Sequence, residues 1–204
     1  MIYMFEGHWP SIDPSSFVHP QASVTGNVTI GKNVYVGPGA AIRGDWGAII
    51  IEDDCNIQEN CTIHMFPGVE VRLKKKAHIG HGAVIHGATI GVNSMIGMNA
   101  VIMDNVTVGN ECIVGALTLI LSDTIIPDRS VVVGNPGRII KEVSDEMLAW
   151  KTKGTELYMK LARQMLSMGK ESSADPDQGL EKIMQEKNSN YKAWHDTRNN
   201  LEDV

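Results

Sequence analysis

The chain of 204 residues is poor in aromatic side chains, in cysteine and in long apolar runs. Aromatic residues make up 5% of the sequence, which argues against a core of large rings and favours a narrow interior that holds only aliphatic side chains. No apolar stretch approaches the roughly 20 residues that span a bilayer. Residues 1–6 contain neither a basic start nor a long apolar segment, so we expect no signal peptide and a cytoplasmic protein.

Positive charge is also scarce. Lysine and arginine number 18 against 24 acidic residues, which gives a formal net charge of −6. This balance argues against nucleic acid and against an anionic membrane as partners. The three cysteines, Cys55, Cys61 and Cys112, occupy equivalent places in the repeat described next. We interpret them as small buried hydrophobic residues and not as a disulfide or a metal site.

Over its first 140 residues the chain lacks the apolar period near 3.6 that a helix requires. Aliphatic residues recur instead every six positions, with one slip of three residues, one inserted loop and one step of five. This is the pattern of the hexapeptide β-helix, in which three short strands form each triangular coil and coils stack by strand pairing. The recurring anchors are Val18, Val24, Ile30, Val36, Ile42, Ile51, Ile57, Ile63, Leu73, Ile79, Ile85, Ile90, Ile96, Ile102, Val108, Val114, Ile120, Ile126 and Val132.

These nineteen anchors, at three per coil, predict a mainly β domain of about six coils over residues 1–140. Past it, Ser144 and Asp145 can cap a helix. We predict that residues 141–170 form a C-terminal helix packed on the β-helix, with Gly154 as a point where it kinks or breaks. Residues 171–204 are predicted to be a polar tail, either partly disordered or holding a short helix. The helically spaced apolar residues are Leu157, Tyr158, Leu161, Ala162, Met165 and Leu166.

Three histidines fall at defined places in the repeat. If the first anchor lies on side one of the coil, His64 and His86 each follow a side-two anchor in successive coils, below Arg43. They should stack with a rise of about 4.8 Å, so that both imidazoles can bind one ion. His81 stacks on Glu59 after side one, about a full side away. A threefold assembly would let His81 of a neighbouring chain complete a three-histidine metal site. The alternatives are chance surface histidines, or polar packing in a trimer seam.

Several segments with these spacings resemble the γ-class carbonic anhydrases. They are Arg43–Asp45, Asn56–Asn60 and His78–Gly87, together with His64. More narrowly, the chain is similar to the branch that includes the phenylacetic-acid-degradation and carnitine-operon hexapeptide proteins. Residues 96–104 and 153–158 fit that branch too, and the resemblance covers roughly residues 5–166. The histidine spacing with its upstream Arg-x-Asp is specific, whereas the repeat alone is shared with acyltransferases.

The resemblance implies a left-handed β-helix and a homotrimer with metal sites at its subunit interfaces. Zinc, or another divalent ion such as Fe²⁺ or Co²⁺, would be bound by His64 and His86 of one subunit and His81 of the next. Three neutral imidazoles leave one coordination position open and lower the pKa of bound water towards about 7. The resemblance also implies that Arg43 and Asp45 form an intersubunit ion pair, that Gln58 orients the metal-bound water and that Tyr158 closes the pocket. Glu59 takes the place where the family more often has aspartate.

One departure from the family leaves the reaction open. The best-characterised γ-class enzymes carry an acidic loop credited with proton transfer, whereas here Glu70 is followed by Lys74–Lys76. Our first expectation is a hydratase that interconverts CO₂ and bicarbonate with metal-bound hydroxide. The alternatives are a metal-dependent acyl-CoA thioesterase, a hexapeptide acyltransferase with a histidine base, and a non-catalytic trimeric scaffold with a structural metal. Arg43, Asp45 and Gln58 favour an enzyme, because a structural zinc site would close its fourth position with protein.

Overall fold

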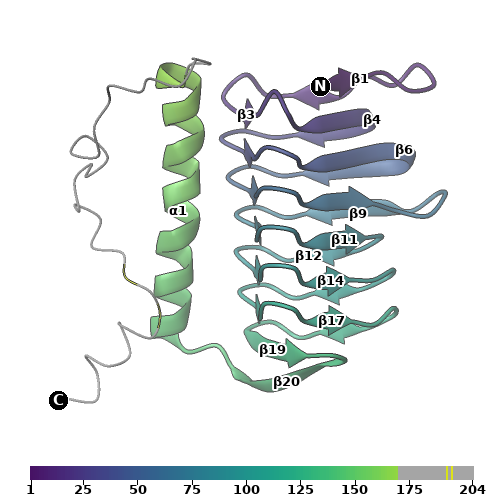
Figure 1. Cartoon of the computed structure of the whole chain (residues 1–204). Helices are drawn as coiled ribbons and strands as arrows, with labels where there is room; N and C mark the ends of the chain where they lie inside the picture. Colours follow the sequence, from purple (N-terminus) through teal and green to yellow (C-terminus); the bar gives the residue numbers. More distant parts are fainter. Residues whose placement is uncertain (170–191, 193, 195–204) are drawn as a thin grey trace, which may run out of the picture.

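The computed structural model describes residues 1–169, 192 and 194. Its main part is a stack of triangular coils with one helix along a flank (Figure 1). The parallel β-helix has about seven turns, one more than the anchors predict. The first turn escaped the count because its strands, β1 (Ile2–Tyr3) and β2 (Ser11–Ile12), precede the regular repeat and pair with β4 (Ser23–Ile30).

The strands of each side pair in parallel with those one coil away. Side one holds β3 (Phe17–Val18), β5 (Tyr35–Val36), β7 (Asn56–Ile57), β10 (His78–Ile79), β13 (Met95–Ile96), β16 (Ile113–Val114) and β19 (Ser130–Gly134), with β20 (Gly137–Glu142) added antiparallel at the end. Side two holds β1, β8 (Thr62–His64), β11 (Val84–His86), β14 (Val101–Ile102) and β17 (Leu119–Ile120). Side three holds β2, β9 (Glu70–Leu73), β12 (Thr89–Ile90), β15 (Thr107–Val108) and β18 (Ile125–Ile126).

Two long strands, β4 and β6 (Ala41–Ile51), pass from side two into side three without a break. Their register shifts at this corner: Gly44 lies opposite Gly26, but Ile49 lies opposite Val28. The three additional residues of β6 therefore bulge out of the ladder, as extra residues in a strand do. This bulge is the slip of three seen in the anchor spacing.

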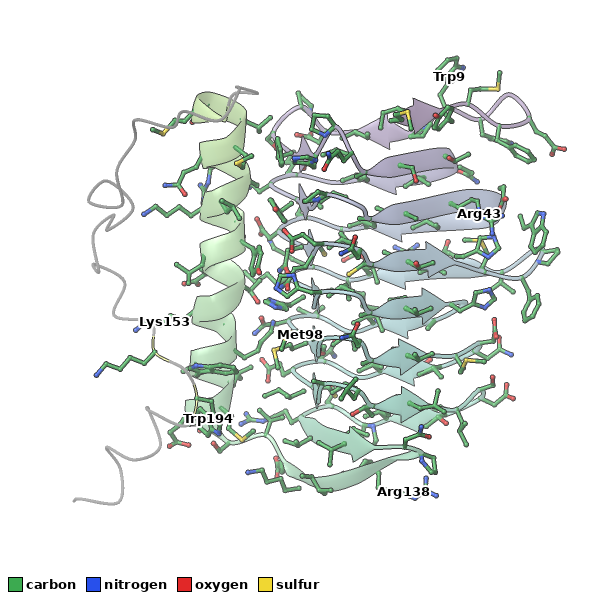
Figure 2. The ribbon with its side chains drawn as sticks, in the orientation of Figure 1. Trp9, Arg43, Met98, Arg138, Lys153 and Trp194 are labelled. Carbon is green, nitrogen blue, oxygen red and sulfur yellow. The ribbon has the colours of Figure 1, made fainter. Side chains whose placement is uncertain are left out.

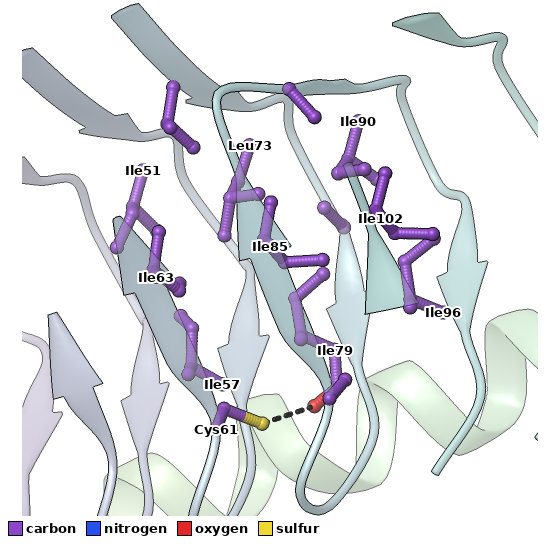
Figure 3. Packing of buried hydrophobic residues seen from close by; sticks show 14 of the residues in the cluster. Ile51, Ile57, Cys61, Ile63, Leu73, Ile79, Ile85, Ile90, Ile96 and Ile102 are labelled. Carbon is purple, nitrogen blue, oxygen red and sulfur yellow. Dashed lines mark hydrogen bonds between the residues drawn. The ribbon is translucent and has the colours of Figure 1, made fainter. Parts of the chain in front are cut away.

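The core is a set of aliphatic columns in which equivalent residues of successive coils stack, such as Ile51, Leu73 and Ile90 (Figure 3). Leu73 pairs with Ile51 on one side and Ile90 on the other, which confirms that the residues just before β9 are looped out. Buried aliphatic side chains of this kind supply most of the folding free energy, at about 25 cal/mol per Å² of apolar surface removed from water. All three cysteines are buried and unpaired, as expected, and the Cys61 thiol contacts the carbonyl oxygen of Ile79 at 3.8 Å.

The helix α1 (Asp145–Met168) is capped by Ser144, whose hydroxyl accepts from the backbone N–H of Met147. It then runs back along side one towards the first coils (Figure 1). The predicted kink at Gly154 is wrong, because the helix continues through this buried residue. The expected apolar face is confirmed only in part: Ala162 is buried, but Leu157 is 40% exposed. The other buried residues of the helix are Met147, Lys151, Gly154 and Thr155.

The tail predicted over residues 171–204 lies outside the described residues, apart from Lys192 and Trp194. The carbonyl of Lys192 accepts a hydrogen bond from the Trp150 indole at 2.9 Å. Among the residues that the structure describes, no helix is both long and apolar enough to cross a membrane.

Some corners stack so closely that only glycine fits, and this can be tested by substitution. A Cβ added at Gly91 would lie 2.1 Å from the carbonyl oxygen of Gly109 in the next coil, whereas one at Gly68 would meet nothing within 4 Å. We expect Gly91→Ala to lower the free energy of unfolding by about 3 kcal/mol, because backbone must move. Gly68→Ala is the control and should cost about 1 kcal/mol, from its positive φ alone. Equal losses of stability in urea unfolding would contradict this account.

Candidate active site

His64 and His86 end strands β8 and β11 and lie directly opposite each other in the ladder. Their ring centroids are 5.3 Å apart, with the rings tilted by 58°. Arg43 lies one coil further along the same column, because Ile42 pairs with Ile63. The structure thus brings together the two histidines that the repeat places on side two.

The bulge of β6 supplies the partner of His64. Asp45 Oδ1 lies 2.9 Å from His64 Nε2, and the other carboxylate oxygen pairs with Arg43 of the same chain. Partial burial acts to raise the pKa of Asp45, but the bonds to His64 and Arg43 outweigh it and lower that pKa. A role of Arg43 and Asp45 between subunits stays a prediction, since here they pair within one chain.

Two exposed rings flank the histidine pair. Trp46, in the bulge, lies 5.2 Å from His64, and Phe66, in the loop before β9, lies 5.0 Å from His86. Both aromatic side chains are about half exposed, at 49% and 56%. His86 is held from below, since its Nδ1 lies 2.6 Å from Asp104 Oδ1.

His81 lies elsewhere, at the corner between sides one and two. Its Nδ1 contacts Glu59 Oε2 at 2.5 Å, and Glu59 Oε1 accepts from the Tyr35 hydroxyl at 3.0 Å. Partial burial acts to raise the pKa of Glu59, but its backbone, Tyr35 and His81 bonds lower it on balance. In Figure 2 Met98, one coil below His81, faces the helix, whereas Arg43 lies at the opposite edge. One chain therefore does not bring His81 to the His64–His86 pair.

The donor set fits a divalent ion. Imidazoles that bind metals usually give their second ring nitrogen to a carboxylate, and all three histidines have such a partner. His81 and His86 use Nδ1 for the carboxylate and leave Nε2, while His64 uses Nε2 and leaves Nδ1. Within the described part of one chain no three His, Cys, Asp or Glu side chains converge on a metal position. A three-histidine site would need a second copy.

A largely apolar cavity of about 580 Å³ lies between α1 and side one. Gln58, His81 and Tyr158 form part of its wall, so the structure gathers three of the residues singled out from the sequence at one place. The Tyr158 ring lies 5.6 Å from that of Tyr35. The apolar part of the wall comprises Met95, Ile96, Met98, Ala116, Leu157 and Leu161.

Sequence reasoning missed two residues of this cavity. The spacing of the repeat gives His78 no role, but His78 lies between Gln58 and Thr155, at 2.7 and 3.3 Å. Lys151 of α1 is buried, and its Nζ donates to Asn93 Oδ1 at 2.6 Å. Burial lowers the pKa of Lys151 to about 7. Lys151 lies 58 residues from Asn93 in the sequence, and His78 lies 77 residues from Thr155, so no local spacing predicts either contact.

The comparisons agree with this architecture. Models of the bacterial transferase hexapeptide match residues 10–44 and 87–122, and a model of the hexapeptide repeat of succinyl-transferase matches residues 48–87. The chain belongs to the hexapeptide-repeat family. Carnitine operon protein CaiE of Escherichia coli (strain K12) is 40% identical over 159 residues, which are 78% of this chain and 81% of that protein. The expected carnitine-operon branch is thereby confirmed.

Solved structures show the same fold. A Bacillus cereus protein provisionally classed as an acetyltransferase has a TM-score of 0.81 and 28% identity, covering 82% of this chain and 97% of that one. A hexapeptide transferase family protein from Anaplasma phagocytophilum has a TM-score of 0.77 and 28% identity, with 79% and 96% covered. Both of these structural relatives carry transferase names.

The partly buried His78 makes stability depend on pH. Burial lowers the pKa of His78 from 6.5 to about 3, so the unfolded chain takes up this proton first as the pH falls. The free energy of unfolding should therefore have its full value above pH 6.5 and decrease between pH 6.5 and about 3, by up to about 1.4 kcal/mol per pH unit. Urea unfolding at about pH 7.5, 5.5 and 4.5 should show a shallower dependence of the free energy of unfolding on pH in His78→Gln than in the parent. The surface change His8→Gln is the control. Equal dependence in the parent and His78→Gln would contradict the prediction.

Proposed function

We propose that the protein is an acyl-transfer enzyme that takes its acyl group from a thioester such as an acyl-CoA. The acyl chain would lie in the cavity between α1 and side one, and His81 would act as general base. One observation carries the proposal: a mostly apolar cavity of about 580 Å³ opens beside a histidine whose second ring nitrogen is tied to a carboxylate.

The size and wall of the cavity favour an acyl group over CO₂. Binding sites for organic ligands typically enclose about 300–1,000 Å³ and are lined by apolar side chains with a few polar groups. Here Met95, Met98, Leu157 and Leu161 supply apolar wall, and Gln58 supplies a polar group. CO₂ has only three atoms and gains nothing from such a volume. The transferase names of the structural relatives support the same choice.

His81 has the arrangement of a base. Because Nδ1 donates to Glu59, Nε2 keeps its lone pair, and Tyr35 holds Glu59 in turn. As the hydroxyl, amine or water of the acceptor attacks the thioester carbonyl, its proton passes to Nε2. The new C–O or C–N bond forms, the C–S bond breaks, and the proton is passed on to the leaving thiolate. With water as acceptor the same steps make a thioesterase.

A second candidate is a metal-dependent hydratase shared between subunits of a homotrimer. The observation that favours it is the carboxylate partner of each histidine, His64, His81 and His86. A divalent ion, when bound, would supply Lewis acidity and a water of lowered pKa. His64 and His86 of one subunit would hold it together with His81 of the next. Gln58, Glu59 and Tyr158 would then orient polar groups beside it, and Arg43 with Asp45 would border it.

The two candidates differ in which histidines they require. If His81 is a base without metal, His81→Ala should lower kcat for thioester cleavage by about 10²-fold or more. His86→Ala and a chelator should then change kcat only a few-fold. If the site is metal-dependent, His64→Ala, His81→Ala and His86→Ala should each remove the metal and the activity. Thioester cleavage and CO₂ hydration are assayed side by side, with metal content measured on the same samples.

Mixed assemblies provide the matching control. His64→Ala and His81→Ala lack different ligands, so reassembly of the two variants together should restore some metal binding at a shared site. Verified mixed trimers without metal would reject the shared site. Wild-type protein that cleaves no thioester and hydrates no CO₂, with and without metal, would reject both candidates in favour of a scaffold.

The acyl pocket can be tested by narrowing it. Ala116 lies on the cavity wall, so Ala116→Leu should lower kcat/KM for octanoyl-CoA or benzoyl-CoA by about 10-fold or more relative to acetyl-CoA. Thr107→Leu adds a similar bulk to an exposed position on side three and serves as the control. An equal loss for short and long acyl groups in Ala116→Leu would show that the acyl chain lies elsewhere.

A further inference from the structure

We propose that His78 is a positioning residue that couples the docking of α1 to the orientation of the Gln58 amide. In this assignment Thr155 of α1 fixes the tautomer of His78, and His78 in turn fixes Gln58 with its carbonyl oxygen Oε1 towards the cavity. Only the last step, in which Oε1 accepts a hydrogen bond from the attacking group of the acceptor, rests on the proposed acyl transfer.

The tautomer follows from the hydroxyl of Thr155. Thr155 is buried, and its Oγ1 donates to the backbone carbonyl of Lys151, one helical turn earlier, at 3.4 Å. The hydroxyl hydrogen is thereby engaged, and the lone pairs of Oγ1 remain for His78 Nδ1 at 3.3 Å. In this assignment His78 Nδ1 carries the hydrogen, and Nε2 is an acceptor. An imidazole with one donor and one acceptor position satisfied in this way is neutral.

The amide of Gln58 is set by that acceptor. Gln58 Nε2 lies 2.7 Å from His78 Nε2 and 3.0 Å from Asn56 Oδ1. Both N–H groups of Gln58 are engaged, so Nε2 faces the buried side. Oε1 accepts no hydrogen bond from the described residues, and Gln58 lines the cavity. An acceptor oxygen is thus presented to a bound ligand.

A buried donor without a partner lies beside this network. Asn56 is fully buried, and its Nδ2 has no hydrogen-bond partner among the described residues. Turning the Asn56 amide would direct Nδ2 at Gln58 Nε2, donor against donor. If His78 carried its hydrogen on Nε2, both amides could reverse and the orphan donor would find Gln58 Oε1. The two tautomers of His78 therefore correspond to opposite orientations of the Gln58 amide, which is the coupling that the proposal asserts.

Burial supports a neutral ring throughout the physiological range, because it lowers the pKa of His78 to about 3, with smaller contributions from Lys151 and His81. A charged ring would donate from both nitrogens and would require Gln58 to turn. The neutral ring therefore keeps a constant acceptor at Nε2.

The test replaces the Thr155 hydroxyl without changing the volume of the side chain. In Thr155→Val, His78 loses its acceptor at Nδ1, and we expect nitrogen NMR of the ring to report a change from the Nδ1–H to the Nε2–H tautomer. Thr155→Ser keeps the hydroxyl and should keep the parent tautomer. For thioester cleavage, kcat should fall about 10-fold in Thr155→Val with KM little changed, and Thr155→Ser should restore it.

The spectroscopic outcome does not depend on any activity. An Nδ1–H tautomer that persists in a folded Thr155→Val would overturn the coupling, even if thioesters are cleaved. A tautomer change with unaltered kcat would overturn the positioning role. If no thioester is cleaved at all, the acyl-transfer proposal fails, while the tautomer and the Gln58 side-chain amide resonances still decide the coupling. Thr155→Ala gives the same readouts if the valine variant does not fold.

Discussion

Every other feature of the molecule depends on the stacking of one coil on the next. Backbone hydrogen bonds tie each strand to the strand one coil away, as from Gly80 N–H to the Ile96 carbonyl at 2.8 Å. A strand side chain alternates between inside and outside, so a slip of one residue would turn anchors out and polar residues in. This register is what makes His64 and His86 neighbours although they are far apart in the chain. The chemistry on the surface inherits its geometry from the apolar columns within.

The candidate site is built where the repeat is interrupted. A strictly regular β-helix presents uniform walls, and three departures from it here lie beside histidines. The bulge of β6 directs Asp45 and Trp46 towards His64, and the loop before β9 places Phe66 against His86. The return of α1 along side one encloses His78 and makes the cavity. The regular part thus holds the ladder rigid, and the irregular parts bring polar and aromatic groups to it.

The three histidines of the candidate sites share one pattern of charged partners. Each of His64, His81 and His86 has a single carboxylate partner, which fixes one ring nitrogen and leaves the other. That arrangement suits a metal ligand and a general base equally well, so the fold alone does not decide the reaction. What separates the candidates is the cavity beside His81 and the distance between the two histidine columns. The cavity favours acyl transfer, and the two columns permit a site shared between copies.

The sequence by itself determined the period-six fold, the burial of the cysteines, the helix cap at Ser144 and the two histidine columns. It also determined that Leu73 resumes the anchor pattern after an inserted loop. It could do so because strand pairing links residues about one coil apart, and spacing along the chain therefore reports stacking in space. It undercounted the turns, since β1 and β2 lack the repeat, and it placed a kink at Gly154 where packing against side one keeps the helix intact. Only the tertiary structure decided how α1 docks. The contacts of Thr155 with His78 and of Lys151 with Asn93 depend on which helix face is buried against which coil, and no periodicity in the chain encodes that choice.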